Sequence, residues 1–158
     1  MATLTESVLV DASLAETWDC YFEPRGWRAW VDGFQAVESA EGYPETGGTL
    51  VWRSTPAGRG RVSERVLEHS PRTRHRIEFA DPESSGELLS SFAVDGEATR
   101  VTLTLDYRLR KSNPFTVLTD RLFVRGQVRQ SLQRTLLKLR QEVEEAAAFA
   151  ERNAARNE

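Results

Sequence analysis

The chain has 158 residues, of which 39% are hydrophobic and 28% charged, which suits one domain with a single core. A net charge of -3 gives no general attraction to nucleic acid or acidic lipid, and the single cysteine, Cys20, excludes an internal disulfide. The first residues lack the charged and apolar regions of a signal peptide, so we expect a cytoplasmic protein with no transmembrane segment.

The first predicted elements are a strand over residues 4–10, where apolar and polar side chains alternate, and a short helix. Ser13 and Glu16 have the spacing of a capping box, in which each side chain accepts a hydrogen bond from the backbone N–H of the other residue. A proline and a glycine then end this helix before a second short helix, which carries Trp27 and Trp30.

Six further strands are predicted between residues 34 and 109. Runs of strand-forming residues alternate with turn signals such as Gly47-Gly48, Ser70-Pro71 and Asp95-Gly96. Strands that follow one another through short turns favour an antiparallel meander, because parallel crossovers need helices that this stretch lacks. The last strand, over 101–109, alternates apolar and polar residues along its length.

One long helix is predicted after the last strand, with Asn113 as its N-cap and Pro114 at its first position. It can continue to about residue 151, either unbroken or with a break near Gly126. Residues 152–158 have no apolar stripe, and we expect them to fray. The expected organisation is therefore one domain over 1–151 followed by a frayed tail.

The order of elements predicts an α+β protein with a seven-stranded curved antiparallel sheet around its C-terminal helix. The segments VLVDASLAETW (8–18), GGTL (47–50), VLEHSP (66–71) and LQRTLLKLRQEV (132–143) occupy framework positions of such an arrangement. With them the chain resembles the helix-grip superfamily of START and birch-pollen-allergen-like proteins, and most closely its polyketide cyclase/dehydrase and lipid-transport group. The resemblance covers nearly the whole chain. It implies a ligand cavity between sheet and helix but no catalytic residue, because such folds serve binders, carriers, enzymes and interaction modules.

The alternation of strand residues predicts which side chains face the cavity. If Val94 lies opposite Val101 across the last hairpin, Phe92 lies opposite Leu103 and Ser90 opposite Leu105, and in the same register Leu88 meets Tyr107. The same parity turns Leu50, Trp52, Val62, Val66, Ile77 and Phe79 inward. The polar residues on this inward face are Glu64, His75, Ser90 and Tyr107. A buried polar group needs a partner, so these four are candidate ligand contacts.

Each of these residues also has a structural interpretation. His75 is either a hydrogen-bonded core histidine or a general base that works near neutral pH. Glu64 is either a buried acid with a raised pKa or, after a one-residue slip in a neighbouring turn, a solvated surface residue. Trp30, Trp52 and Tyr107 are either packing residues or parts of the cavity wall whose polar edges contact a ligand.

The terminal helix has a second irregularity. Its apolar stripe comprises Leu118, Leu122, Leu132, Leu136, Leu139 and Val143, and Arg125 and Arg129 fall inside that stripe. If the two arginines face the sheet, they need a carboxylate such as Glu64 or an acidic ligand. Alternatively, a bend at Gly126 turns them toward water, or their charged ends reach solvent along the apolar surface.

The outward face of the sheet is predicted to be basic, with Arg61, Arg65, Arg72, Arg74 and Arg76 side by side. Such a patch suits an acidic macromolecular partner, such as an acidic protein, RNA or an anionic membrane. The alternative is a solvated face that protects the sheet from edge pairing.

No motif for a metal, a nucleotide or a catalytic triad is present, so we expect no cofactor. The leading hypothesis is binding or transport of a small-to-medium hydrophobic molecule with a polar or acidic end. The expected ligand-binding residues are Trp30, Trp52, Glu64, His75, Ser90, Tyr107, Leu122, Arg125 and Arg129. The alternatives are a cyclase or dehydratase that uses the same cavity, with His75 or Glu64 as the catalytic group, and a macromolecular interaction module.

Overall fold

A seven-stranded antiparallel sheet forms the frame of the protein in the computed structural model, which describes residues 2–110 and 117–158. The strands are β1 (Ala2–Val10), β2 (Phe34–Glu41), β3 (Thr49–Ser54), β4 (Arg61–Ser70), β5 (Arg74–Ala80), β6 (Ser84–Asp95) and β7 (Ala98–Leu109), in the spatial order β1-β7-β6-β5-β4-β3-β2. The helices are α1 (Leu14–Tyr21), the short 3-10 turn η1 (Pro24–Gly26), α2 (Trp27–Trp30) and α3 (Val117–Arg156). The α+β prediction and its order of elements are confirmed.

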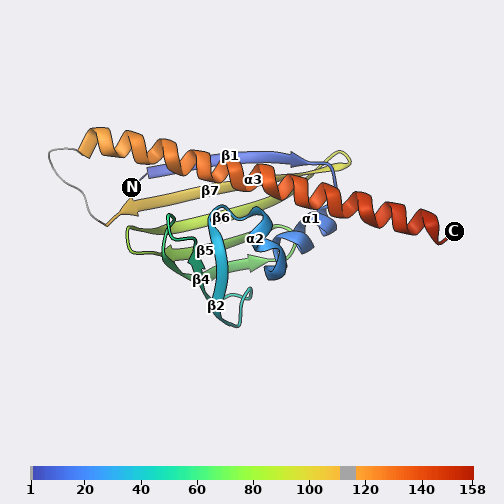
Figure 1. The fold of residues 1–158 in the computed structure, drawn as a ribbon, viewed down its shortest axis with the longest axis horizontal. Helices are drawn as coiled ribbons and strands as arrows, with labels where there is room; N and C mark the ends of the chain where they lie inside the picture. The colour runs from blue at the N-terminus through green and yellow to red at the C-terminus, as the bar shows by residue number, and fades with distance from the viewer. Residues whose placement is uncertain (1, 111–116) are drawn as a thin grey trace.

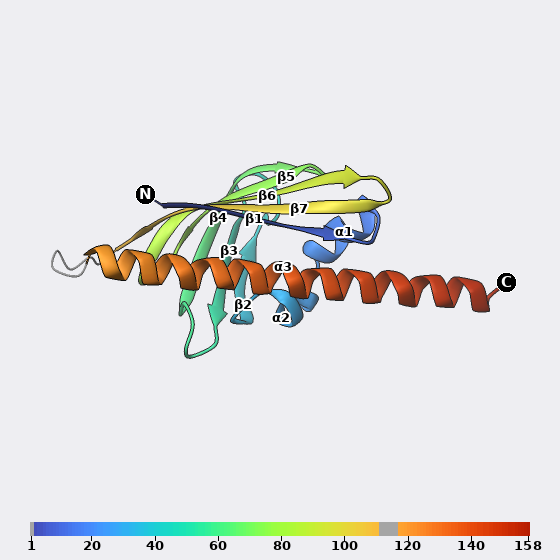
Figure 2. The ribbon, with the colours of Figure 1, turned by 90° about the horizontal axis from the view of Figure 1, so that it is seen from above.

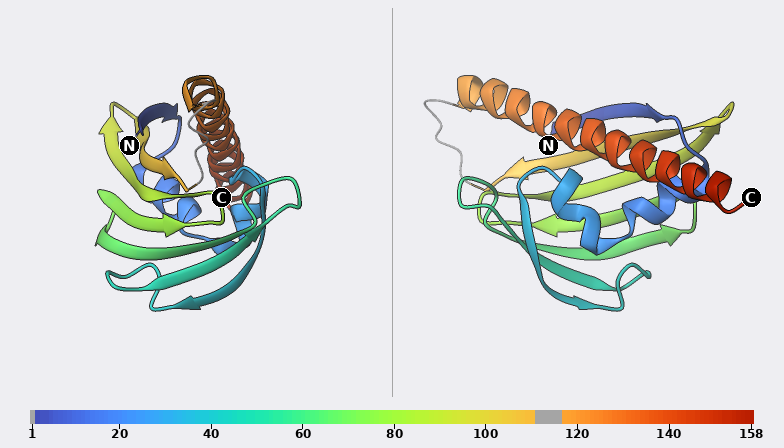
Figure 3. Two further views of the ribbon diagram at one scale, coloured as in Figure 1. Left: turned by 90° about the vertical axis from the view of Figure 1, so that its left-hand side faces the viewer. Right: turned by 45° about the vertical axis from the view of Figure 1, so that its right-hand side comes forward.

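The sheet is strongly curved, and its concave side holds the helices. Figure 1 shows α3 running alongside β1, and the two short helices also contact the sheet, α1 at β6 and β7 and α2 at β2. The views in Figures 2 and 3 show the sheet bending around α3, whose C-terminal turns project beyond the strands. None of the described helices is long and apolar enough to cross a membrane. The fold therefore creates an interior that is closed by the sheet on one side and by helices on the other.

The connection between β1 and α1 forms as the sequence predicts. The Glu16 backbone N–H donates to Ser13 Oγ at 3.1 Å, and the Ser13 N–H donates to Glu16 Oε2 at 2.9 Å, which completes the capping box. The helix buries Trp18 and Tyr21 against the sheet side of the interior. A capped start and an aromatic buried face together fix the direction in which the chain crosses toward α2.

The hairpin between β6 and β7 corrects the predicted register. Asp95 pairs with Ala98 across a two-residue turn, so Phe92 lies opposite Val101, and Ser90 opposite Leu103. The predicted pairing of Val94 with Val101 is wrong by two residues, because Gly96 at φ 63° allows a tighter turn than expected. A shift of two residues preserves the side-chain parity. The predicted inward faces are accordingly confirmed, and His75, Ser90, Tyr107 and the apolar residues around them are buried.

Helix α3 packs along only part of its length. Leu136, Leu139 and Val143 are buried, whereas Leu122 is 66% exposed although it belongs to the same predicted stripe. The stripe repeats every 3.5 residues on average, and on a straight helix such a repeat drifts by about 20° per heptad, or about 60° between residues 143 and 122. Val124 and Val128 are partly buried against the core and take over the inward face in this half.

The helix runs without interruption through Gly126, so the alternative of a break there is not found. It also continues to Arg156, past the predicted end near residue 151. The fraying of residues 152–158 stays a prediction. The predicted cap residues Asn113 and Pro114 lie outside the described residues. Along its length the unbroken α3 contacts β1, α2 and α1, and β1 is the strand that it contacts most.

Candidate functional site

A cavity of about 150 Å³ lies between the concave face of the sheet and helices α2 and α3. Trp30, Trp52, Glu64, His75 and Ser90 from the predicted ligand-binding set line it. Most of the other lining side chains are apolar or aromatic, as is usual for sites that hold small organic molecules.

A larger groove of about 570 Å³ adjoins this cavity. Glu64, Arg59 and Leu88 line both hollows, and Tyr107 lines the groove alone. The groove is walled by Val124 and Val128 of α3, from the half of the helix that packs loosely. We call the part of the interior at α1 and α2, where Tyr21, Trp27 and Trp30 are buried, the closed end, and the part under the N-terminal half of α3 the open end.

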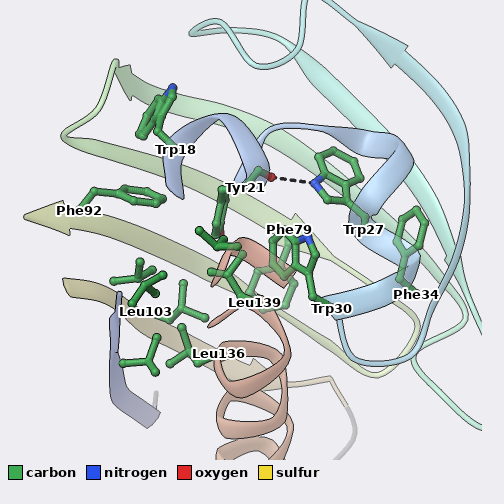
Figure 4. Packing of buried hydrophobic residues seen from close by; sticks show 14 of the residues in the cluster. Trp18, Tyr21, Trp27, Trp30, Phe34, Phe79, Phe92, Leu103, Leu136 and Leu139 are labelled. Carbon is green, nitrogen blue, oxygen red and sulfur yellow. Dashed lines mark hydrogen bonds between the residues drawn. The ribbon is translucent and has the colours of Figure 1, made fainter. Parts of the chain in front are cut away.

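Aromatic rings form the closed end of the cavity. The ring centroids of Tyr21 and Trp30 are 5.0 Å apart, and those of Tyr21 and Phe92 are 5.2 Å apart. Figure 4 shows Tyr21 between Phe92 on one side and Trp27 and Trp30 on the other, with Leu139 of α3 nearby. Aromatic pairs at these separations contribute about 0.5–1.5 kcal/mol beyond the burial of their surface. This end is therefore the better-packed part of the interior.

Hydrogen bonds hold the rings of Tyr21 and Trp27 in place. Trp27 Nε1 donates to the Tyr21 backbone carbonyl at 2.8 Å, drawn as the dashed line in Figure 4. The Tyr21 and Ser90 hydroxyl oxygens are 2.5 Å apart and share a hydrogen bond. Burial raises the pKa of Tyr21 to about 12, so its hydroxyl stays protonated at neutral pH. Ser90 is thus bonded within the protein as well as exposed to the cavity.

His75 lies beside Ser90 on the neighbouring strand and pairs with a second histidine. The Nδ1 atoms of His69 and His75 are 3.0 Å apart, a distance at which one nitrogen donates and the other accepts. Burial, together with the nearby His69, lowers the pKa of His75 to about 4, so the ring is neutral at pH 7. A neutral imidazole here fits a hydrogen-bonding role better than that of a fixed positive charge.

Two buried nitrogens at this end have no hydrogen-bond partner among the described residues. They are Nε1 of Trp30 and Nε2 of His75, and each side chain is 3% exposed. An unpaired buried donor or acceptor costs about 1–3 kcal/mol, so such atoms are uncommon in folded proteins. Both residues line the cavity. The pair therefore marks a place where a further molecule can complete the hydrogen bonding.

Glu64 forms a second polar region, where the cavity meets the groove. Its Oε1 accepts a hydrogen bond from Trp52 Nε1 at 2.7 Å. Burial raises the pKa of the Glu64 carboxyl, although the Trp52 hydrogen bond and the charge of Arg59 act in the opposite direction. Arg59 itself pairs with Asp81 at 2.9 Å and lies over the Phe79 ring, 4.7 Å from its centroid. This cation is already compensated within the protein.

The two polar regions are well separated along the sheet. Glu64 pairs with Phe79 of β5, and His75 lies four residues before Phe79 on that strand. At about 3.3 Å per residue the separation along the strand is about 13 Å. Glu64 and His75 therefore do not act on one atom of a small ligand.

The remaining predicted ligand-binding residues lie outside the closed cavity. Arg129 pairs with Glu6 of β1 at 3.1 Å, and Arg125 donates to the Thr3 backbone carbonyl at 3.1 Å. Glu6, not Glu64, supplies the carboxylate. Leu122 is exposed and lines neither hollow. The arrangement matches the alternative in which the arginine head groups reach the surface, although it arises from helical drift and not from a bend at Gly126.

The predicted basic face of the sheet is largely compensated. Arg61 pairs with Glu38 at 2.8 Å, Arg74 with Glu68 at 2.7 Å, and Arg76 lies 3.6 Å from Glu87. Arg72 lies in the turn between β4 and β5, at φ 59°, and not on a strand face. Arg65 is directly opposite Glu78 in the strand register. The surface mixes both signs of charge, and a macromolecular partner is not supported.

Sequence reasoning missed a polar link between α3 and the connection that follows α2. The Asp32 carboxylate accepts hydrogen bonds from Ser131 Oγ at 2.7 Å and from Arg134 at 3.0 Å. Partial burial tends to raise the pKa of Asp32, but these hydrogen bonds outweigh it and the pKa is lowered. The sequence signal is weak, since Asp32 and Arg134 are about a hundred residues apart and neither belongs to a motif. The link joins the wall of the cavity to the middle of α3.

Arg59 and Tyr43 also line the cavity without having been predicted. Both lie in connections between strands, where strand parity gives no information about direction. Within residues 2–110 and 117–158, no group of three or more His, Cys, Asp or Glu side chains has a geometry suited to a metal ion.

The curved sheet, the helix lying in it and the hollow between them define a helix-grip protein with an internal cavity. Comparison with protein families agrees with this class. The chain belongs to the polyketide cyclase/dehydrase and lipid transport family, whose sequence profile matches residues 1–144. A search of curated proteins found no match.

Solved structures share the fold at low sequence identity. An aromatase/cyclase from Streptomyces sp. R1128 has a TM-score of 0.74 and 17% identity, over 90% of this chain and 93% of its own. A protein from Thermus thermophilus has a TM-score of 0.72 and 22% identity, over 92% and 99%. The Aha1 dimer from Colwellia psychrerythraea has a TM-score of 0.65 and 14% identity, over 91% and 97%. These likenesses establish the fold alone. Family membership supports a hydrophobic-ligand-binding or cyclase-type role without specifying a substrate.

Proposed function

We propose that the protein binds a small, largely apolar molecule in the cavity between the sheet and α3. The observation that carries the proposal is a mainly apolar hollow of about 150 Å³, lined by buried aromatic side chains, that adjoins a groove of about 570 Å³ through shared lining residues. A ligand gains by covering apolar surface in the closed part, and the groove gives it a way in from solvent. Transport between partners or membranes is one use of such binding.

A cyclase or dehydratase is the second candidate function. What favours it is the presence of two titratable groups with shifted pKa values on one cavity, Glu64 raised and His75 lowered. Because the two lie about 13 Å apart along the strands, one of them would have to act alone or through water. In that case Glu64→Gln or His75→Ala stops the conversion of a bound compound but retains its binding, as measured by mass spectrometry of the products.

Native mass spectrometry of freshly purified protein, followed by denaturing extraction, tests the binding proposal directly. We expect a co-purified small molecule or, for protein that is stripped and refolded, measurable binding of biphenyl by calorimetry. Leu88→Trp fills the junction of the two hollows and should weaken binding about tenfold or more. Ile77→Phe, also in both linings, provides a second filled variant.

The matched control is Val94→Trp, which adds the same side chain to the same strand at a position that is 66% exposed. It should bind as the wild type does. Circular dichroism and thermal melting establish that each variant folds. Unchanged binding in folded Leu88→Trp and Ile77→Phe would place the ligand elsewhere and refute the proposal.

A further inference from the structure

The closed end of the cavity contains a hydrogen-bond donor with no acceptor. Trp30 and Trp27 belong to the same short helix, both are buried, and both line the cavity. Trp27 Nε1 donates to the Tyr21 carbonyl, whereas Trp30 Nε1 has no partner within the described parts of the chain. An indole N–H can only donate. The group that completes this site must therefore present an acceptor atom.

His75 offers a second free nitrogen at the same end. The Tyr21 ring packs against Trp30, the Tyr21 hydroxyl bonds Ser90, and Ser90 lies opposite His75 in the sheet register. This chain of contacts connects His75 to Trp30 along the lining of the cavity. When His69 Nδ1–H donates to His75 Nδ1, the free Nε2 of His75 carries the proton and becomes a donor. Both nitrogens can then donate, and a carbonyl oxygen has two lone pairs with which to accept.

Charge at this end argues against an anionic group. His75 is neutral at pH 7, and the Arg59 guanidinium that lines the cavity is already bonded to Asp81. Arg125 and Arg129 bond β1 at the surface. A carboxylate moved into the closed end would lose its hydration without gaining a free cation, which is strongly unfavourable. A neutral acceptor carries no such penalty.

The dimensions limit the shape of the ligand. A cavity of about 150 Å³ in an engineered protein accepts a benzene-sized molecule, so the closed end accommodates about one ring. The cavity and the groove together have room for more, and Glu64 stands where they meet. A ring system that enters from the groove thus reaches the two free nitrogens with its leading end.

We propose that the closed end is a subsite for a neutral carbonyl oxygen borne on a ring, which accepts hydrogen bonds from Trp30 Nε1 and His75 Nε2. The inference rests on the proposed binding function and adds the chemical class of the group that is recognised. It assigns Trp30 as a specificity-determining residue. Fatty-acid-like ligands that lead with a carboxylate are disfavoured at this site.

Three probes of similar shape test the assignment: biphenyl, 4-acetylbiphenyl and biphenyl-4-carboxylate, titrated calorimetrically into the protein at pH 8. A net hydrogen bond changes affinity by about threefold to tenfold, so the ketone should bind tighter than the hydrocarbon by that factor. The carboxylate should bind weakest. Trp30→Phe should bring the ketone-to-hydrocarbon ratio of affinities close to one.

Trp27→Phe is the matched control, since it removes the same indole nitrogen from a neighbouring residue whose hydrogen bond is internal. Its ketone-to-hydrocarbon ratio should equal that of the wild type. Infrared spectroscopy of carbonyl-labelled 4-acetylbiphenyl gives a readout that does not depend on affinity. The carbonyl stretch should move to lower frequency on binding to wild type and Trp27→Phe, and move less on binding to Trp30→Phe.

The outcomes separate the two proposals. If biphenyl binds but Trp30→Phe leaves the ratio and the carbonyl stretch unchanged, the carbonyl subsite is refuted while binding in the cavity stands. Tightest binding by the carboxylate also overturns the subsite, in favour of anion recognition. If none of the three probes binds the wild type, the subsite fails, and the cavity-binding proposal fails with it when no small molecule co-purifies with the protein.

Discussion

The closed and open ends of the interior are built in opposite ways although one helix spans both. At the closed end, Leu136 and Leu139 of α3 are buried against aromatic rings from α1 and α2. At the open end, Val124 and Val128 of the same helix wall a groove, and Leu122 faces solvent. Helix α3 thus anchors the fold with one half and leaves access to the cavity with the other.

Truncation of one leucine in each half of α3 should give the largest contrast. Leu139 is 0% exposed, so Leu139→Ala should reduce the free energy of unfolding by about 2–5 kcal/mol, as buried leucines usually do. Leu122→Ala should change it by less than about 0.5 kcal/mol, because that side chain is 66% exposed. Urea denaturation measures both. Similar losses in the two variants would contradict the division of α3.

The closed end should also make the protein sensitive to acid. The pKa of His75 is about 4 in the folded protein and near 6.5 in the unfolded chain, so the unfolded state takes up the proton first as pH falls. Stability is therefore lost between pH 6.5 and 4, and this group alone accounts for about 2 kcal/mol between pH 7 and pH 5. Denaturation curves at the two pH values measure the loss. His75→Phe should flatten this dependence, and an equally steep one in that variant would count against the assignment.

A smaller effect is expected where the two ends meet. Asp32→Asn removes the charge that Ser131 and Arg134 bind, and it should lower the free energy of unfolding by about 1 kcal/mol. Arg129→Gln is the control at the open end. Its ion pair with Glu6 is half exposed and should contribute less than about 0.5 kcal/mol. Thermal melting at low salt compares the two, and a larger loss from Arg129→Gln would reverse the order of importance.

Much of the fold was predictable because strand patterns repeat every two residues. The β6–β7 hairpin shows how far this goes, since the predicted register was wrong by two positions while His75, Ser90 and Tyr107 still faced inward as predicted. The capping box of α1 could be read directly, because Ser13 and Glu16 are three residues apart and interact locally. Such signals depend only on neighbouring residues.

The helical and long-range parts of the site were harder to predict. A helical wheel gives the angle of Arg129 around α3 but not the point at which the helix diverges from the sheet, so the pairing with Glu6 was not foreseen. The Asp32–Arg134 pair and the position of Arg59 depend on loops and on contacts between distant parts of the chain. The free nitrogens of Trp30 and His75 could be recognised only after every neighbouring partner was known.

The last turns of α3 have a consequence for how the protein can be handled in solution. The Glu144 carboxylate accepts from the Asp11 backbone N–H at 2.9 Å, Ala147 is the last residue of α3 packed against the core, and the later residues are exposed. Nucleation is the costly step of helix formation, and the packed part of α3 already supplies it. Residues 148–156 therefore only extend an existing helix, by about 13 Å. A dye attached to residues 148–156 therefore reports on the rotational diffusion of the whole protein, because this segment continues a rigid helix. It also lies beyond the part of α3 that lines the cavity and the groove.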